Sequence, residues 1–407
     1  MDGYNQHDSN GNEDMTENGY EVVDVNDGDA AAESEDDMND EEFAEGAMGP
    51  SDDEEIQAYS RSYRQHQGSV FSVAIDPANG NLALTGGEDD VAYLWSLENG
   101  NILLECKGHK DSVTCVSFSS NSKYFATGDM SGIVKVWEVE KKQEIFSAEC
   151  SDIEWMEWHS NYPVLLAGAI DGNVWMWQIP TGLCKMCQSH GSKSTCGKVF
   201  NDGNRACFGY EDGSIKIVDL RTLSTLYHIS GNTGHSDAVT SIDIYSDGIL
   251  IATSSLDGSI KVINSANGRV VLTHAASWPD NSNNDNNTNT EAEKSVEAIS
   301  FSKLQTLLAS ASLNGDLAIW DLPTQRLRHR CKHEGGVSKL LWNPTKPLLY
   351  TGGLNGNILV WDGLNGECLK VWHGHYDEIL DLAISGDGER LLSCSSDSTM
   401  RLYNLQQ

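Results

Sequence analysis

The first 55 residues contain neither lysine nor arginine, although they hold 21 of the chain's 61 aspartates and glutamates. They also have few large apolar side chains, so they cannot bury enough surface to offset the entropy lost on ordering. We therefore predict a disordered acidic tail over residues 1–55. The other residues carry 40 acidic and 27 basic side chains, a net charge of −13. This charge repels phosphate backbones and attracts basic polypeptides, so direct nucleic-acid binding is not expected.

Long apolar runs are also missing, and without one of about 18 residues no membrane span is expected. The N-terminus lacks the basic start and apolar run of a secretion signal. The ten cysteines lie singly in apolar segments rather than in a disulfide framework, which favours a reducing compartment, the cytosol or the nucleus. No glycine-rich phosphate loop or nucleophile elbow occurs, so we expect neither a cofactor nor an enzymatic activity.

What the chain does contain is an internal repeat. Eight short segments align, and each has a tight-turn dipeptide followed by a strand that ends on a large apolar anchor. The anchors are Trp95, Trp137, Trp177, Val218, Ile263, Trp320, Trp361 and Tyr403. Their spacings are 42, 40, 41, 45, 57, 41 and 42 residues. A period of about 40 to 45 residues with Gly-His and Trp-Asp pairs is typical of four-stranded propeller blades.

Other positions keep a constant distance from the anchors. Histidine lies 28 residues before five anchors and 29 before the first, and threonine or serine lies ten residues before six of them. In this pattern the chain resembles WD-repeat proteins over residues 56–407, in which such side chains form a buried hydrogen-bonded group in each blade rather than catalytic triads. The resemblance assigns to these groups His109, Thr127, Trp137, His333, Thr351, Asn355 and Trp361.

We therefore predict an all-β, eight-bladed WD-repeat β-propeller preceded by the disordered acidic tail. The last unit ends soon after Tyr403 and lacks its fourth strand, which a segment near residues 58–65 can supply by alternating bulky and polar residues. The 57-residue spacing marks a polar insertion over residues 277–294, which we expect to be a mobile loop. The third and fourth units should be irregular, because Ala167 and Phe208 cannot donate or accept a side-chain hydrogen bond.

The stretch DIEWMEWH, residues 152–159, admits three interpretations: a catalytic carboxylate pair, a clamp for a cationic ligand, or ordinary strand residues. Its alignment with residues 111–118 places it on the innermost strand of the third blade. Side chains alternate along a strand, so we expect Glu154 and Glu157 on opposite faces, unable to share a proton. Glu154 would then lie near the mouth of the channel, with Trp155 beside it.

One face of the ring, the top face, should collect the Asp-Gly turns, the Gly-His connections and many acidic side chains. We predict that it binds a basic protein or peptide, with Trp155 as an aromatic contact; the alternative is that the acid only keeps the ring soluble. The predicted acidic contacts are Glu88, Asp90, Asp111, Asp129, Asp152, Glu154, Glu211, Asp237, Glu334, Asp377 and Glu378. No metal site is expected, since Cys184 and Cys187 should point to opposite faces of an outer strand.

Segments such as TGGEDDVAYLW and EWMEWH, after a long acidic tail, resemble one branch of the WD-repeat family. That resemblance implies a cytoplasmic interaction scaffold, linked to cell migration and angiogenesis, which we expect to be a monomer. It also implies kinship to a fungal eight-bladed chaperone that captures a basic ribosomal protein during ribosome biogenesis. The alternative is a signalling scaffold or a ubiquitin-ligase adaptor, because Val218 to Arg221 is a degenerate Trp-Asp-x-Arg box.

Overall fold

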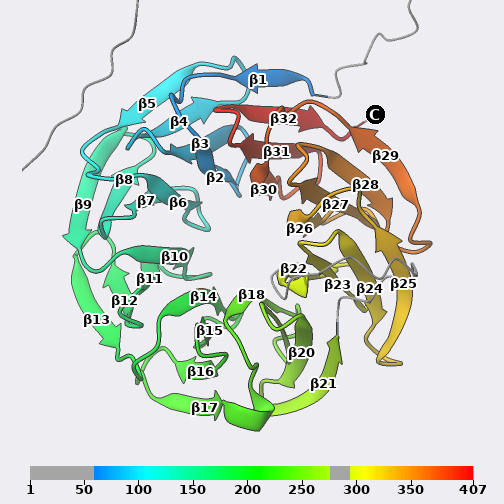
Figure 1. The fold of residues 1–407 in the computed structure, drawn as a ribbon. Coiled ribbons are helices and arrows are strands. Elements are labelled where there is room, and N and C mark those ends of the chain that lie inside the picture. The colour runs from blue at the N-terminus through cyan, green and yellow to red at the C-terminus, as the bar shows by residue number, and fades with distance from the viewer. Residues whose placement is uncertain (1–58, 276–293, 407) are drawn as a thin grey trace, which may run out of the picture. The chain divides into compact units, whose positions relative to one another are not determined.

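The computed structural model describes residues 59–275 and 294–406. They form eight four-stranded antiparallel sheets, arranged as blades around a central channel (Figure 1). The predicted all-β, eight-bladed propeller is therefore confirmed. The predicted tail, residues 1–55, and the predicted loop, residues 277–294 apart from Lys294, lie outside the described residues.

The first four blades follow one another along the chain, each running from the channel outwards. Blade one consists of β2 (Val70–Ile75), β3 (Leu82–Gly87), β4 (Ala92–Ser96) and β5 (Ile102–Cys106). Blade two consists of β6 (Val113–Phe118), β7 (Tyr124–Asp129), β8 (Ile133–Glu138) and β9 (Gln143–Glu149). Blade three consists of β10 (Ile153–Trp158), β11 (Val164–Ala169), β12 (Val174–Gln178) and β13 (Leu183–Cys187). Blade four consists of β14 (Ser194–Val199), β15 (Arg205–Tyr210), β16 (Ile215–Asp219) and β17 (Thr225–Ile229).

The other four blades repeat this order after a short 3₁₀ helix, η1 (Gly231–Thr233). Blade five consists of β18 (Val239–Ile244), β19 (Leu250–Ser255), β20 (Ser259–Asn264) and β21 (Arg269–Ala275). Blade six consists of β22 (Val296–Phe301), β23 (Leu307–Ser312), β24 (Asp316–Asp321) and β25 (Arg326–Lys332). Blade seven consists of β26 (Val337–Trp342), β27 (Leu348–Gly353), β28 (Ile358–Asp362) and β29 (Cys368–Trp372). Blade eight consists of β30 (Ile379–Ile384), β31 (Arg390–Ser395), β32 (Met400–Asn404) and an outer strand from the start of the propeller, β1 (Arg61–Tyr63).

The two ends of the propeller meet in blade eight. Strand β1 pairs antiparallel with β32, with Arg61 opposite Leu402 and Tyr63 opposite Met400. In Figure 1 the blue β1 and the red β32 accordingly lie side by side. Tyr63 is only 4% exposed, and its ring packs edge-on against Trp95 of blade one at a centroid distance of 5.2 Å. The closing strand therefore joins the last blade to the first as well as completing the last sheet.

The turn between the second and third strands explains why a glycine recurs in the turn dipeptides. In blade two the dipeptide is Ser131-Gly132, and Gly132 has a φ of +89°, in the left-handed region that side-chain-bearing residues avoid. A Cβ atom at this position would also collide with the carbonyl group of Cys150 on the following connection. Glycine is required here by both the backbone conformation and the close approach of the next segment.

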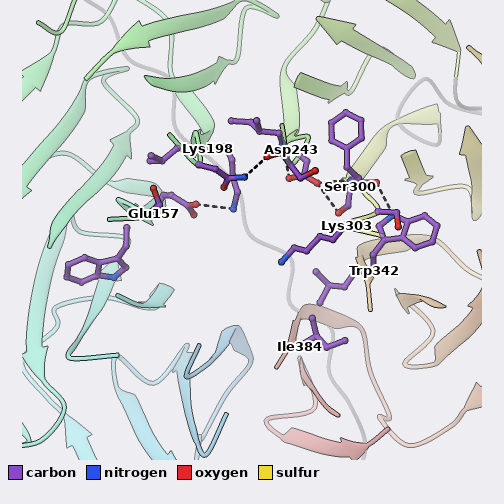
Figure 2. Close-up of a pocket in the computed structure, with 16 residues that line it drawn as sticks. Glu157, Lys198, Asp243, Ser300, Lys303, Trp342 and Ile384 are labelled. Atoms are coloured by element: carbon purple, nitrogen blue, oxygen red, sulfur yellow. Dashed lines mark hydrogen bonds and ion pairs between the residues drawn. The ribbon is translucent and has the colours of Figure 1, made fainter. Parts of the chain in front are cut away.

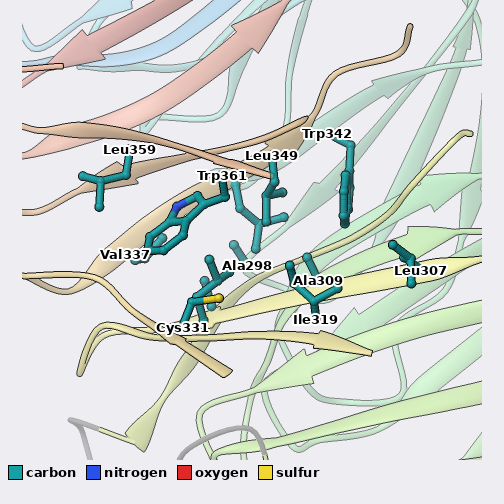
Figure 3. Packing of buried hydrophobic residues seen from close by; sticks show 13 residues of the cluster. Ala298, Leu307, Ala309, Ile319, Cys331, Val337, Trp342, Leu349, Leu359 and Trp361 are labelled. Carbon is teal, nitrogen blue, oxygen red and sulfur yellow. The ribbon is translucent and has the colours of Figure 1, made fainter. Parts of the chain in front are cut away.

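The hydrophobic core lies between neighbouring blades. Figure 3 shows the contact of blades six and seven, where Ala298, Ala309 and Ile319 face Val337 and Trp361. All five side chains are 5% exposed or less. Burying a large apolar side chain contributes about 1.5–3 kcal/mol, so a ring of eight such contacts dominates the stability of the propeller. Each blade thus depends on both of its neighbours.

Every innermost strand carries a β-bulge at its second residue. The pairing register of β10, for example, shifts between Ile153 and Trp155, which leaves Glu154 as the extra residue. The same shift occurs at the start of the other seven innermost strands. A bulge changes the alternation of side chains along its strand. This detail, which the repeat pattern does not reveal, changes where the channel side chains point.

Candidate peptide-binding face

The predicted hydrogen-bonded group is present in blade two. The two ring nitrogens of His109 lie 2.9 Å from a carboxylate oxygen of Asp129 and 2.8 Å from the hydroxyl of Thr127. The indole N–H of Trp137 donates to the same hydroxyl at 3.1 Å. The assignments of His109, Thr127 and Trp137 are confirmed, and blade one repeats the arrangement with His66, Asp89, Thr85 and Trp95. These polar side chains are structural and not catalytic.

Blade seven departs from the prediction. Trp361 donates to Thr351 at 2.9 Å, as expected. His333, however, contacts the backbone of Gly335 through Nδ1, and its Nε2 is buried without a hydrogen-bond partner among the described residues. Asn355 accepts a hydrogen bond from the backbone of Asn357 rather than from the histidine. The assignment of His333 and Asn355 to a shared group is therefore wrong. The side chain of Asn355 bonds within its own turn, and the imidazole of His333 bonds to the backbone of Gly335 instead.

Blades three and four are irregular in the expected way. Ala167 and Phe208 are completely buried at the positions where other blades carry threonine or serine. In blade three, Trp175 and Trp177 stack with their ring planes 6° apart. In blade four, His190 contacts Asp212 at 3.0 Å and Ser214 at 2.9 Å, bonding within its own turn region. Apolar packing replaces the central hydroxyl in both blades.

Acidification should destabilise the propeller through its buried histidines. Burial lowers the pKa of His109 and His375, although the neighbouring Asp129 and Asp397 act in the opposite direction. In the unfolded chain such histidines titrate near pH 6.5, so between that value and their lowered native pKa the unfolded state binds more protons. Stability is then lost as the pH falls, by about 1.4 kcal/mol per pH unit for each group. We expect thermal melting temperatures to be lower near pH 5.5 than near pH 7.5; an unchanged or higher value at the lower pH would contradict this.

Ten carboxylates lie where the innermost strands begin and where the second strands end, which defines the top face. They are Glu88, Asp90, Asp111, Asp152, Glu154, Glu211, Asp237, Glu334, Asp377 and Glu378, and we call this set the acidic rim. Eight of them are exposed, whereas Asp90 and Glu154 are partly buried. Within residues 59–275 and 294–406, only Glu154 has a basic side chain within 4 Å. A hydrogen bond from the backbone N–H of Ser69 lowers the pKa of Glu88, so it is charged at neutral pH.

Two predicted contacts do not reach this surface. Asp129 is 0% exposed and belongs to the hydrogen-bonded group of blade two, so it is not a rim residue. Trp155 is 8% exposed, and its indole N–H donates to Ser194 of the next blade at 3.0 Å. Gly168 and Gly197 pass so close to the indole that neither could carry a Cβ atom. The prediction of Trp155 as an accessible aromatic contact is therefore wrong.

Glu154 and Glu157 also differ from the prediction. Both point to blade four, where Glu154 pairs with Lys193 at 2.7 Å and Glu157 pairs with Lys198 at 3.0 Å. They reach the same neighbour because the bulge at Glu154 changes the alternation of side chains on β10. Glu157, helped by Asp243, raises the pKa of Lys198 against the opposing effect of burial. The two glutamates stabilise a junction between blades and do not form a catalytic pair.

The sequence prediction missed apolar side chains on the same face. Met130, Ile170 and Leu256 are 49%, 46% and 39% exposed in the turns between second and third strands, and Tyr376 is 85% exposed near the start of β30. The first three lie seven residues before an anchor, the position that Glu88 and Glu211 occupy in their own blades. That constant offset is the signal from which they could have been found. The top face therefore offers carboxylates interspersed with apolar side chains.

The opposite, bottom end of the channel holds a cavity of about 640 Å³. Figure 2 shows Glu157, Lys198 and Asp243 along one side of it, with Ile384 across the opening. Asp243 accepts hydrogen bonds from the hydroxyl of Ser300 at 3.0 Å and from the backbone N–H of Phe301 at 2.7 Å. Glu157 is paired with Lys198, and Asp243 is hydrogen-bonded. Lys303 also lines the cavity, so the lining carries two carboxylates and two lysines and has no net excess of either charge.

Two further findings concern the chemistry that the fold could support. No group of three or more His, Cys, Asp and Glu side chains in the described part of the chain is arranged to hold a metal ion. Cys184 is exposed and Cys187 is buried, as expected for opposite faces of β13. Among residues 59–275 and 294–406, no helix has the length and apolar character needed to cross a membrane.

Comparison with known proteins identifies the family. A model of the WD domain, G-beta repeat, matches residues 58–96, 100–138, 224–264, 286–321, 325–362 and 366–404. The chain belongs to the WD-repeat family. The matched segments omit residues 139–223, which contain most of blades three and four, where Ala167 and Phe208 replace the central hydroxyl. This WD-repeat protein thus departs from the common pattern in blades three and four.

Individual relatives within the WD-repeat family confirm the branch predicted from the sequence. The angio-associated migratory cell protein of Homo sapiens is 42% identical over 367 residues, covering 89% of this chain and 82% of that protein. The ribosome assembly protein SQT1 of Saccharomyces cerevisiae is 26% identical over 314 residues, covering 69% of this chain and 70% of that protein. The structure of Chaetomium thermophilum Sqt1 bound to the N-terminus of ribosomal protein L10 has a TM-score of 0.76 at 21% identity, covering 86% of this chain and 100% of that one. At that identity the structural likeness concerns the fold.

Proposed function

We propose that this WD-repeat protein is a non-enzymatic scaffold that holds a basic polypeptide segment on its acidic rim. The observation that carries the proposal is the set of nine rim carboxylates with no basic side chain within 4 Å in the described residues. Unpaired carboxylates on a rigid surface attract a basic chain over about 10 Å at 0.1 M salt. Each exposed ion pair adds only about 0.2–1 kcal/mol, so several of them must act together.

We propose further that the bound segment belongs to a large-subunit ribosomal protein, held as a monomeric chaperone would hold it. The relative Sqt1, with the same fold, has been crystallised with the N-terminus of ribosomal protein L10, which supports this client class. The apolar side chains Met130, Ile170 and Tyr376 would favour basic segments that also contain aromatic or aliphatic residues. Binding would keep such a segment from other polyanions until it is transferred.

A cytoplasmic location with access to the nucleus is part of the same proposal. All ten cysteines lie in the described residues and are unpaired there, which fits a reducing compartment. A role in cell migration or angiogenesis would rest on the name of the human relative alone. None of the contacts described for the acidic rim points to cell migration or angiogenesis.

Charge reversal on the rim tests this function. We expect Glu88→Lys, Asp152→Lys and Glu211→Lys together to weaken binding of a fluorescent peptide from the N-terminus of ribosomal protein L10 by about 10- to 100-fold in fluorescence anisotropy. The matched control replaces Glu98, Glu140 and Glu367 with lysine, because these exposed glutamates lie in turns of the bottom face and have no ion pair in the described residues. An equal loss in both variants, or no loss in the first, would contradict a binding site on the rim.

A further inference from the structure

The junctions between neighbouring blades on the bottom face share a packing device. In three of them, an aromatic side chain from the outer strand of one blade lies over a glycine in the turn that precedes the outer strand of the next blade. The pairs are Phe146 over Gly182, Tyr227 over Gly268 and His329 over Gly366, and a Cβ atom on the glycine would lie 3.2, 2.7 or 2.6 Å from the ring residue. Each of these glycines has a positive φ. The aromatic side chain closes the gap between the two blades.

The junction of blades three and four lacks this device. Lys185 pairs with Met176 across β13 and β12, as Phe146 pairs with Val136 in blade two, so lysine replaces the aromatic residue. In the facing turn of blade four, the residue with positive φ is Leu223, at +58°. Lys142 and Gln325 occupy this position in blades two and six, and glycine occupies it in blades one, three, five and seven. At the junction of blades three and four, the gap between the blades is a groove of about 510 Å³.

The groove combines apolar and cationic chemistry. Its lining includes the apolar side chains of Val164, Met176 and Leu220. Tyr162 and Leu183, which also line it, are 67% and 66% exposed, among the most exposed large apolar side chains of the described residues.

Lys185 and Arg221 are the two cationic side chains of the lining, which also includes the polar residues His159, Gln178 and Asn204. Neither cationic side chain forms an ion pair within 4 Å among residues 59–275 and 294–406. The nearby carboxylate of Asp219 accepts a hydrogen bond from the backbone N–H of Arg221, and the charge of Arg221 helps to lower its pKa. Two cations beside an apolar hollow repel a basic ligand and attract an acidic one. The groove is thus opposite in charge to the acidic rim on the other face.

We propose that this groove binds an acidic segment of a partner protein, which inserts an aromatic side chain where three other junctions use their own. The aromatic ring of the partner would take the place that Phe146, Tyr227 and His329 fill at their junctions, over Met176 and Leu220. Flanking carboxylates would pair with Lys185 and Arg221. Because the acidic rim selects basic segments, the propeller can hold two partners of opposite charge, one on each face, and the groove does not depend on the function proposed for the rim.

Peptide binding to the full chain tests the proposal. The probe is a fluorescein-labelled peptide Glu-Asp-Glu-Phe-Asp-Glu, with two comparison peptides that carry serine for phenylalanine or lysine for every acidic residue. We expect saturable binding of the first with a Kd of about 10–100 µM and at least about tenfold weaker binding of the others. Lys185→Glu with Arg221→Glu should weaken binding of the first by at least about tenfold. Arg269→Glu with Lys370→Glu, at two exposed cations on other outer strands, should leave it unchanged.

A second variant separates loss of the groove from loss of the fold. Lys185→Phe with Leu223→Gly rebuilds the aromatic-over-glycine packing, so it should abolish binding while the melting temperature is maintained or raised. Equal binding of the serine peptide, no effect of either groove variant, or no saturation up to about 1 mM would overturn the proposal. Displacement of the peptide by a single-stranded oligonucleotide at similar concentration would also overturn it, in favour of a nucleic-acid ligand.

Discussion

Replacing Asp129 with alanine should lower the free energy of unfolding by about 3–5 kcal/mol, the largest effect expected of any single carboxylate in the propeller. Asp129 is 0% exposed and accepts hydrogen bonds from His109, from the backbone of Lys110 and Ile133, and from both the backbone and the hydroxyl of Ser131. Burial alone would raise its pKa, but the hydrogen bonds from Ser131, Ile133, Lys110 and His109 hold the pKa below its usual value. Alanine would leave these donors buried without an acceptor.

The measurement is urea unfolding of wild type and variant at neutral pH, where Asp129 is charged. Asp152→Ala is the matched control, because Asp152 is an exposed rim carboxylate with no side-chain hydrogen bond or ion pair among the described residues, and its loss should change stability by less than about 0.5 kcal/mol. A loss below about 1 kcal/mol for Asp129→Ala would show that the blade-two group adds little to stability.

Replacing Tyr63 with alanine should cost about 3–5 kcal/mol and also promote association of the protein. Tyr63 lies on the closing strand β1 and is 4% exposed, in a cluster that joins Trp95 of blade one to Met400 and Leu402 of blade eight. Truncation removes packing from the junction at which the two ends of the propeller meet. If β1 then detaches, the edge of β32 becomes an exposed template for pairing with another chain.

Thermal unfolding and light scattering at increasing protein concentration would test both effects. Tyr63→Phe is the informative control, because the hydroxyl of Tyr63 is buried without a hydrogen-bond partner in the described residues. Phenylalanine keeps the ring and removes only that hydroxyl, so stability should be unchanged or slightly higher. If the Tyr63→Ala variant unfolds at the same temperature as wild type and stays monomeric, strand β1 does not close the propeller as its pairing with β32 indicates.

Much of the fold follows from residues that repeat at fixed offsets from an anchor. Trp137 and Thr127 lie on the neighbouring strands β8 and β7 of one sheet, and His109 lies in the connection that precedes β6 of the same sheet. Their contacts therefore depend on local register, which a repeat preserves. The count of eight blades and the closing segment follow from the same pattern, because an incomplete last unit needs a strand from elsewhere.

The candidate site was only partly predictable from the sequence, because repeat offsets record local register and not the contacts that orient each side chain. Exposed acids such as Asp152 and Asp377 follow from turn positions alone, and those assignments agree with the top-face location of the turns. Asp129 is the last residue of β7, but it turns inward because Ser131 replaces the usual turn aspartate and His109 needs an acceptor. A sequence offset does not distinguish an exposed aspartate from a buried one, because the orientation of the side chain depends on which nearby hydrogen-bond donor lacks an acceptor.

By itself, then, the sequence determined the all-β repeat, the eight blades, the closing strand and the acidity of one face, because each depends on periodicity or on charge counted along the chain. Only the tertiary structure decided that Trp155 is buried, that Glu154 and Glu157 share a neighbour, and that a groove lined by Lys185 and Arg221 opens between two blades. Those features depend on contacts between different blades. The residues that make them are far apart in sequence and meet only when the blades pack, so no spacing within one repeat records them.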